Sequence, residues 1–174
     1  WPDDGGRFIT LGHVFTYDPA TGQRNVGVYR MQVYDRCTTG MHWQIQKGGG
    51  FHFAQSRLSG PGPFPVAFAI GADPATLMAA VSALPEGIDE ILFAGFLRGR
   101  RTPMVRSRTT GLPVLADAEF ILEGVVPHDE TRVEGPYGDH FGHYSHAAPF
   151  PVFHVKSMTH RKGAVYPATV VGRP

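Results

Sequence analysis

The chain has 174 residues, of which 42% are hydrophobic and 18% are charged, and its formal net charge is +1. This length and composition predict a single globular domain over residues 1–174 with a core of its own, and they exclude a disordered tail and a fibrous repeat. The basic residues are scattered except for the run at Arg98, Arg100 and Arg101. We therefore expect no nucleic-acid partner.

The sequence carries no sign of export or of a membrane anchor. Its single cysteine, Cys37, cannot form an internal disulfide, and no stretch is apolar for long enough to span a bilayer. No basic and then apolar leader follows Trp1, so the chain reads as a trimmed product or an isolated domain. The expected location is a reducing cytoplasm.

The first part of the chain is predicted to form strands. Its 22 glycines and 15 prolines fall between short apolar runs, which is typical of a β-rich fold with many turns. Strands are expected at 8–17, 26–34 and 64–70, where β-branched and aromatic residues gather. The segment 18–22 (DPATG) predicts a turn that joins the first two strands into a hairpin. The glycine run 48–50 lacks the spacing of a phosphate-binding loop, and we interpret it as a flexible turn.

Two helices are predicted in the middle of the chain. Asp73 followed by Pro74 has the pattern of an N-cap with proline at the first helical position, and good helix formers follow over 75–84. A second helix is predicted over 88–97, opened by two acidic residues and closed near Gly99.

The rest of the chain returns to strands, at 104–109, 118–126 and 152–160, followed by a turn at 161–163 and a strand at 164–171. Strands therefore come first, then helices, then strands again, without the alternation of a doubly wound nucleotide-binding fold. The order predicts an α+β, β-rich domain of the barrel type.

Three polar clusters are candidates for chemistry. The acids of one of them, 85–95 (PEGIDEILFAG), sit at a predicted helix start, and helix capping alone would explain them. In 25–30 (NVGVYR), strand alternation places Asn25, Gly27 and Tyr29 on one face and Arg30 on the other, where it is either an ordinary surface residue or a functional one. In 134–139 (EGPYGD), a turn separates two carboxylates and can bring both toward one pocket, as acid–base chemistry requires, or lie on the surface.

Histidines at 140, 143 and 146 follow the cluster at 134–139. Their three-residue spacing suggests a metal site, but the residues between them do not indicate a helix that would align the rings. We therefore expect no zinc there.

Many ordered stretches of the chain resemble the UbiD family of prenylated-flavin decarboxylases. They include WPDDGGRFIT, RNVGVYRMQVYDR, TTGMHWQIQKGG, PVAFAIGADPATLMAA, PEGIDEILFAGFLRG, AEFILEGVVP, EGPYGDHFGHY and PVFHVKSMTHRKGAVYPATVVGRP. The resemblance is to the family's central, cofactor-holding domain and implies a split β-barrel of the flavin-reductase type. It also implies reversible, non-oxidative decarboxylation of an aromatic or α,β-unsaturated carboxylic acid.

The resemblance implies a prenylated flavin mononucleotide (prFMN) whose phosphate is held through a divalent metal, usually Mn²⁺, with K⁺ nearby. Asn25 and Glu90 match the family's asparagine and glutamate metal ligands, and hard oxygen ligands suit such an ion. The family's third ligand is a histidine in a stretch similar to HWQIHKDG. This chain reads HWQIQKGG and has the neutral, weaker ligand Gln46 at that position, while His52 lies six residues further on as a substitute.

The family's catalytic trio corresponds by motif to Arg30, Glu134 and Asp139. The resemblance implies that Arg30 holds the substrate carboxylate or tunes a neighbouring acid, that Glu134 pairs with Arg30, and that Asp139 delivers a proton. The electron sink for the loss of carbon dioxide is supplied by the cofactor.

The resemblance also implies partners. Family members commonly carry an N-terminal α/β domain and a C-terminal oligomerising domain, so we expect a homo-oligomer or a partner chain that supplies them, and a flavin prenyltransferase as the source of cofactor. The alternative is a non-catalytic or weakly flavin-binding structural subunit of a multicomponent carboxylase.

Overall fold

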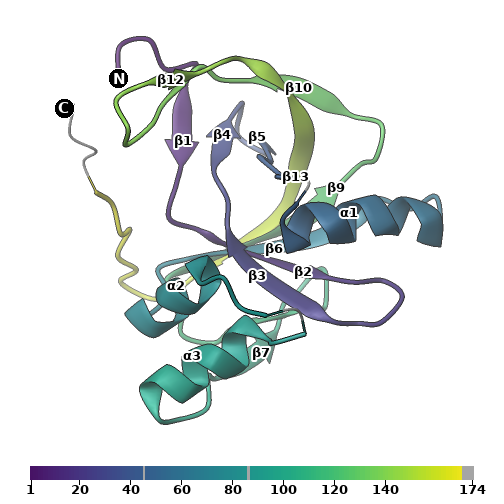
Figure 1. Cartoon of the computed structure of the whole chain (residues 1–174), viewed down its shortest axis with the longest axis vertical. Coiled ribbons are helices and arrows are strands. Elements are labelled where there is room, and N and C mark those ends of the chain that lie inside the picture. Colours follow the sequence, from purple (N-terminus) through teal and green to yellow (C-terminus); the bar gives the residue numbers. More distant parts are fainter. Residues whose placement is uncertain (45, 86, 170–174) are drawn as a thin grey trace.

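The computed structural model describes residues 1–44, 46–85 and 87–169. Its centre is a curled antiparallel sheet with the strand order β1-β4-β5-β13-β9-β6-β2-β3, and β10 pairs with β13 beside this path (Figure 1). The strands are β1 (Arg7–Ile9), β2 (His13–Tyr17), β3 (Arg24–Val28), β4 (Met31–Val33), β5 (Thr38–Gly40), β6 (Phe64–Ile70), β9 (Phe120–Val126), β10 (Thr131–Glu134) and β13 (Ala148–His160).

Three helices and two small hairpins surround this sheet in the described part of the chain. The helices are α1 (Gly48–Ser59), α2 (Pro74–Val81) and α3 (Glu90–Arg98), and the hairpins pair β7 (Met104–Arg106) with β8 (Pro113–Leu115) and β11 (Tyr137–Gly138) with β12 (Tyr144–Ser145). In Figure 1, α2 and α3 lie together below the sheet, and α1 lies at its side. No helix among the described residues is long and apolar enough to cross a membrane.

Strand β13 joins the two parts of the sheet. Its first residues pair with β10, its middle pairs with β5, and its last residues pair with β9. The register shifts between Val155 and Ser157, where the strand changes direction. The β1-β4-β5 group is therefore linked to the β9-β6-β2-β3 group through this strand.

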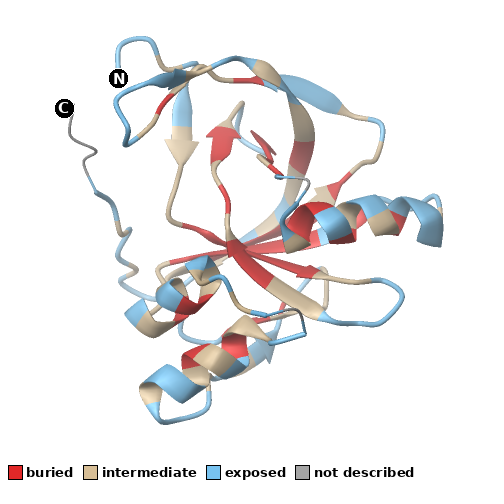
Figure 2. Cartoon of the chain, in the orientation of Figure 1, coloured by how far each residue is buried: buried red, intermediate tan, exposed pale blue. Residues whose placement is uncertain are grey.

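The sheet separates two hydrophobic cores, as the alternation along β6 shows. Val66, Phe68 and Ile70 point into the barrel, whereas Ala67 and Ala69 belong to the second core, with residues of α3 and of the β7-β8 hairpin. Figure 2 shows the buried residues concentrated where the strands cross and on the helix sides that face them.

The structure confirms the β-rich α+β fold and the hairpin of the first two predicted strands, since β2 and β3 pair antiparallel across the predicted turn. The predicted strand at 8–17 is divided into β1 and β2, because β1 pairs with β4 whereas β2 pairs with β3 and β6. The strand predicted at 26–34 is likewise divided into β3 and β4.

Both predicted helices are confirmed. The Asp73 carboxylate accepts hydrogen bonds from the backbone N–H groups of Ala75 and Thr76, and α2 ends at Val81, three residues before its predicted end. Asp89 caps α3 in the same way, and Gly99 closes it in the left-handed conformation.

Two predictions are wrong. The glycine run 48–50 is the first turn of α1 rather than a flexible turn: a side chain at Gly49 would lie 2.6 Å from the Trp43 ring, so glycine lets the helix approach the barrel. Residues 164–169 form no strand, because the Glu119 carboxylate binds Arg161 and the N–H of Val165 and draws this segment back. Residues 170–171 of that prediction lie outside the described residues.

Candidate active site

A cavity of about 270 Å³ lies beside the link between β3 and β4. The segment that follows β5 forms its second wall, and the end of α2 forms its third. The lining residues are Gly27, Val28, Tyr29, Arg30, His42, Gln44, Lys47, Ala80 and Val81. Arg30 and Lys47 bring positive charge to this wall, and no carboxylate belongs to the described lining. The cavity is therefore suited to an anion with an apolar part.

Arg30 and Glu134 form a buried ion pair behind the cavity wall. The Arg30 Nε and Nη2 atoms donate to Glu134 Oε1 at 2.9 and 2.8 Å, and the Glu134 side chain is 0% exposed. The guanidinium also lies 4.6 Å above the Tyr137 ring and donates to Ser145. These contacts, from the link after β3, the end of β10 and the β11-β12 hairpin, hold Arg30 in one orientation.

His42 is a third member of this group, and it was not among the residues predicted from the sequence. Its Nδ1 lies 3.1 Å from each Glu134 carboxylate oxygen, and its ring stacks on Phe150 with centroids 4.1 Å apart. In the sequence, His42 is marked only by its place in the stretch HWQIQKGG. In that stretch we considered only residue 46, where the family has a metal ligand.

Glu134 is held in its ionised form. Burial alone would raise its pKa, but the hydrogen bonds from His42 and Arg30, together with the charges of both residues, outweigh burial and lower the pKa below its ordinary value. The carboxylate therefore acts as an acceptor and counter-ion at neutral pH and does not act as a proton donor.

Asp139 lies apart from this group. It sits in the turn between β11 and β12, where its carboxylate accepts a hydrogen bond from the N–H of Phe141 at 2.8 Å. None of the hydrogen bonds among the described residues joins Asp139 to Arg30 or Glu134, and Asp139 is not among the cavity residues. Of the predicted trio, the structure thus brings two members into contact.

Asn25 and Glu90 both lie near the other end of β3. Glu90 Oε2 accepts a hydrogen bond from the N–H of Val26 at 3.0 Å, and the Asn25 side chain lies against Gly48 at the start of α1. Burial raises the pKa of the nearby Tyr29 phenol, hydrogen bonds with Gly49 and Asn25 offset this in part, and the charge of Glu90 raises it further.

The Asn25 and Glu90 side chains have polar groups that could bind a ligand. The Asn25 Nδ2 atom is buried without a hydrogen-bond partner. Burial raises the pKa of Glu90, and the backbone hydrogen bonds that it accepts, one of them from Val26, offset this only in part. The unpartnered Asn25 Nδ2 is a donor and suits an acceptor such as a phosphate oxygen, whereas a cation would stabilise the ionised Glu90 carboxylate. The oxygen atoms of both side chains are ligands of the kind that a divalent metal takes.

The structure separates the two candidates for the third ligand. Gln46 is exposed in the turn before α1. His52 is buried in α1 with its Nδ1 3.0 Å from the Thr16 hydroxyl, and Thr16 is the cross-strand partner of Asn25. Within the described residues, no group of three or more His, Cys, Asp or Glu side chains is placed to hold a metal ion.

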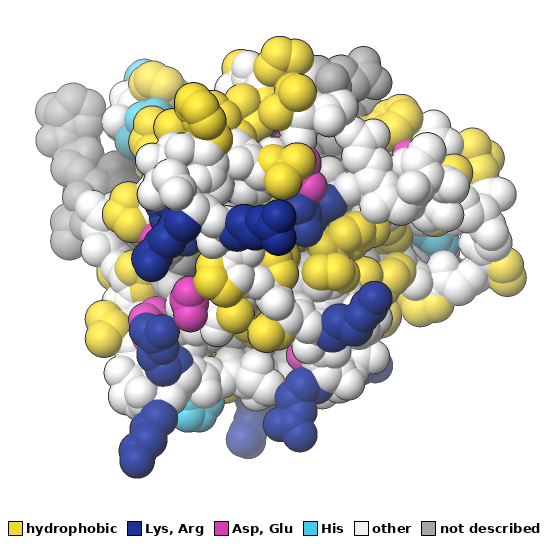
Figure 3. Space-filling view, turned by 90° about the horizontal axis from the view of Figure 1, so that it is seen from below, with side chains coloured by type: hydrophobic (Ala, Val, Ile, Leu, Met, Phe, Trp, Pro, Cys, Tyr) yellow, Lys and Arg dark blue, Asp and Glu magenta, His cyan; other side chains and the backbone are white. Residues whose placement is uncertain are grey.

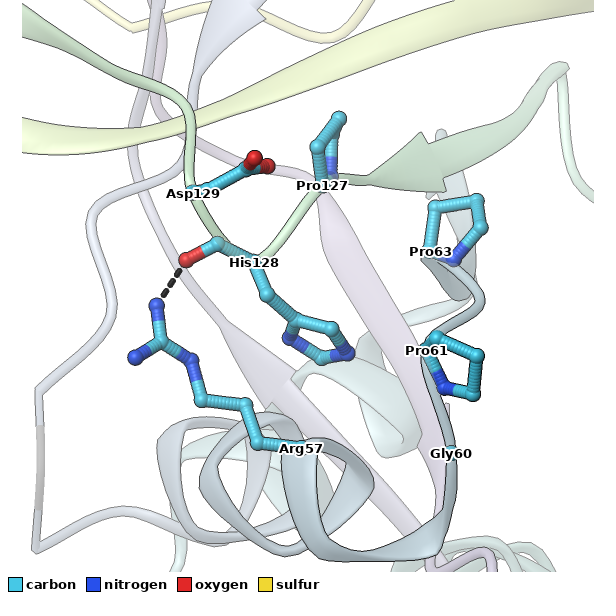
Figure 4. A pocket seen from close by; sticks show the side chains of 7 residues that line it. All are labelled: Arg57, Gly60, Pro61, Pro63, Pro127, His128 and Asp129. Atoms are coloured by element: carbon cyan, nitrogen blue, oxygen red, sulfur yellow. Dashed lines mark hydrogen bonds between the residues drawn. The ribbon is translucent and has the colours of Figure 1, made fainter.

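A larger cavity, of about 750 Å³, lies between the end of α1 and the loop before β10 (Figure 4). Arg57 donates to the backbone oxygen of His128 on one side, and Pro61, Pro63 and Pro127 line the other. It contains none of the predicted site residues. We therefore place the candidate site at the smaller cavity, where buried charge and titratable groups converge.

The chain is similar to known proteins over its whole length. The family described as "UbiD: 3-octaprenyl-4-hydroxybenzoate carboxy-lyase Rift-related domain" matches residues 1–174. The chain belongs to the UbiD family. A relative from Archaeoglobus fulgidus is 56% identical over 174 residues, covering 100% of this chain and 36% of that protein. A relative from Chlamydia pneumoniae, named as one of the subunits of 4-hydroxybenzoate decarboxylase, is 45% identical over 174 residues, covering 100% of this chain and 30% of that protein.

Solved structures support the family and the fold. The UbiD-class enzyme HmfF from Pelotomaculum thermopropionicum, in complex with prFMN, superposes with a TM-score of 0.90 at 33% identity, covering 94% of this chain and 38% of that one. The NADH:FAD oxidoreductase SgcE6 of Streptomyces globisporus superposes with a TM-score of 0.55 at 12% identity, covering 90% of this chain and 78% of that one, which shows the split-barrel fold alone. This UbiD-family chain spans about a third of the relatives that it matches.

Proposed function

We propose that this chain is the prFMN-binding domain of a UbiD-type decarboxylase that acts reversibly on an aromatic or α,β-unsaturated carboxylic acid. The observation that carries the proposal is the fully buried Glu134 carboxylate bound by Arg30 and His42 next to an electropositive cavity. A buried charge group of this kind is costly unless it is paired, and such groups concentrate at functional sites.

The site has two ends, which suits an elongated ligand. Asn25 and Glu90 lie at the start of β3, and Arg30 lies beyond its end, up to about 16 Å away at the rise of an extended strand. We propose that Asn25 and Glu90 hold Mn²⁺ at the phosphate of prFMN, with Gln46 as the third position and K⁺ nearby. The flavin ring would then lie toward Arg30.

The chain's own residues would bind and orient the substrate. When bound, prFMN supplies the electron sink that allows carbon dioxide to leave. Arg30 is fixed through Nε and Nη2, and none of the hydrogen bonds among the described residues uses its Nη1, so that N–H group can donate to a substrate carboxylate. Glu134 keeps the guanidinium in place.

We further propose that the chain works with additional domains, a second copy or a partner chain in the cytoplasm. The helices α2 and α3 expose hydrophobic side chains, among them Leu92 and Phe96 at 72% and 78% exposure. Seen from below, Lys and Arg side chains stand around such hydrophobic groups (Figure 3). Exposed apolar surface of this kind is typical of contact with another polypeptide. A flavin prenyltransferase would supply the cofactor.

The test is to produce the chain together with a flavin prenyltransferase. We expect a bound flavin with the mass of prFMN, Mn²⁺ by elemental analysis, and release of carbon dioxide from a panel of aromatic and unsaturated acids. A colourless, metal-free and inactive protein would refute the proposal for this chain. Mass spectrometry of the cellular assembly identifies the partner polypeptides.

Substitution of Glu134 by Gln tests the site directly. The change removes the charge that fixes Arg30, so we expect turnover to be lost without large loss of bound flavin. Normal decarboxylation by this variant would show that Glu134 is not catalytic. Glu130→Gln is the matched control, because Glu130 pairs with a histidine, His154, outside the cavity.

One observation favours a second candidate function. Gln46 is exposed and stands where the family has a histidine ligand, which leaves two oxygen ligands for the metal. A chain with such a site would bind flavin weakly and act as a structural subunit of a multicomponent carboxylase. Low flavin and manganese content in an assembly that still forms would support this candidate.

A further inference from the structure

The contact between His42 and Glu134 fixes the tautomer of the histidine. Glu134 is ionised and therefore has acceptor oxygens only, and both lie 3.1 Å from His42 Nδ1. The hydrogen must consequently reside on Nδ1. In the neutral ring, Nε2 then carries a free lone pair.

The free nitrogen belongs to a ring that lines the cavity. One face of the His42 ring is covered by Phe150, and Nδ1 is bound to Glu134, but the ring is 20% exposed and belongs to the cavity wall. Nε2 makes none of the hydrogen bonds among the described residues, and it is not one of their buried, unpartnered polar atoms. It is therefore open to the cavity and to solvent.

We propose that His42 is a proton-exchange residue of this site, with Glu134 holding its Nδ1–H and Nε2 exchanging a proton with the ligand. The inference rests on the proposed function, and it gives to His42 the proton transfer that the resemblance implies for Asp139, which is not among the cavity residues. Decarboxylation replaces one carboxylate by one hydrogen, so each turnover consumes one proton. Nε2 takes that proton from solvent and transfers it, and the ring returns to the neutral Nδ1–H form.

The surroundings are organised for this role. Glu134 stabilises the cationic ring that exists between uptake and transfer, while Arg30 balances the carboxylate when the ring is neutral. The stacked Phe150 ring and the contact with Glu134 prevent rotation of the imidazole. A carboxylate that orients a histidine in this manner is a recurrent arrangement in proton-transfer sites.

A second histidine–glutamate pair provides the contrast. His154 Nε2 lies 2.6 Å from Glu130 at a partly exposed position, and neither residue lines the candidate cavity. That pair has the same chemistry without a cavity for a ligand. His154→Asn is therefore the matched control.

The first experiment separates proton exchange from a structural role. In His42→Asn, the side-chain amide takes the place of Nδ1 and still donates to Glu134, but no nitrogen remains at the position of Nε2. We expect unchanged flavin absorbance, unchanged unfolding, and turnover at least about 100-fold lower, whereas His154→Asn keeps the rate of the unmodified chain. Turnover of His42→Asn within a few-fold of that rate would overturn the proposal.

The second experiment needs no turnover. Long-range ¹H–¹⁵N NMR of the flavin-free chain should show His42 as the Nδ1–H tautomer, and Glu134→Gln should remove this preference. An Nε2–H tautomer in the unmodified chain would overturn the proposal. If the unmodified chain is inactive with every acid, the proposed function fails by itself, and the tautomer still decides whether the His42–Glu134 pair exists.

Discussion

Glu123 allows a stability prediction whose size follows from the structure. It lies in β9 with 1% exposure and accepts the backbone N–H groups of Arg108, Thr109 and Thr110 at 2.9, 2.7 and 3.0 Å, as well as the Thr109 hydroxyl. The carboxylate thereby ties the loop between β7 and β8 to the sheet. Burial alone would raise its pKa, but these hydrogen bonds lower it from 4.5 to about 2.

The depressed pKa means that the ionised carboxylate stabilises the fold. A change from 4.5 to about 2 corresponds to about 3 kcal/mol. Because the folded value lies below the unfolded one, this contribution is complete above about pH 5 and is lost as the pH falls toward 2. Glu123→Gln should therefore lower the free energy of unfolding by about 3 kcal/mol at pH 7, and by about 2 kcal/mol less at pH 3.

Urea denaturation followed by tryptophan fluorescence at pH 7 and pH 3 measures both values. Glu119→Gln is the control, since Glu119 binds Arg161 at the surface and should change stability by less than about 1 kcal/mol. An equal loss for Glu123→Gln at both pH values would refute the electrostatic reasoning, because a packing defect does not depend on the ionisation of residue 123.

Two further predictions concern the metal end of the site. In Gly48→Ala, the added Cβ would lie 2.1 Å from Asn25 Oδ1 and displace that side chain. We therefore expect the manganese and flavin contents to fall while circular dichroism shows an intact fold. Unchanged contents would count against Asn25 as a ligand. In Gln46→His, an imidazole replaces the neutral amide, so we expect manganese content by elemental analysis to rise. Equal manganese in this variant and in the unmodified chain would indicate that residue 46 is not a ligand.

Local sequence patterns predicted the elements that local chemistry determines. Asp73 with Pro74 and Asp89 with Gly99 gave both later helices, because caps act within a few residues of the chain. The hairpin of β2 and β3 followed from its turn.

Features that depend on distant contacts were missed. The glycines that open α1 favour a turn by propensity alone. The need for a small residue at Gly49 comes from the Trp43 side chain, which a larger residue would meet and which no local pattern indicates. His42 was missed for the same reason, since its partner Glu134 is 92 residues away. Resemblance supplied Arg30 and Glu134, whose contact the structure shows, and Asp139, which the structure places in a separate turn.

The position of β13 between β5 and β9 bears on how the chain reaches this fold. Until residues from Ala148 to His160 arrive, no strand pairing among the described residues joins the two strand groups on either side of β13. Each group would expose an unpaired edge that can associate with other chains. The barrel can therefore form only after contacts of long sequence separation are made, which is typical of slow folding. A chain cut before Ala148 should aggregate instead of forming half a barrel.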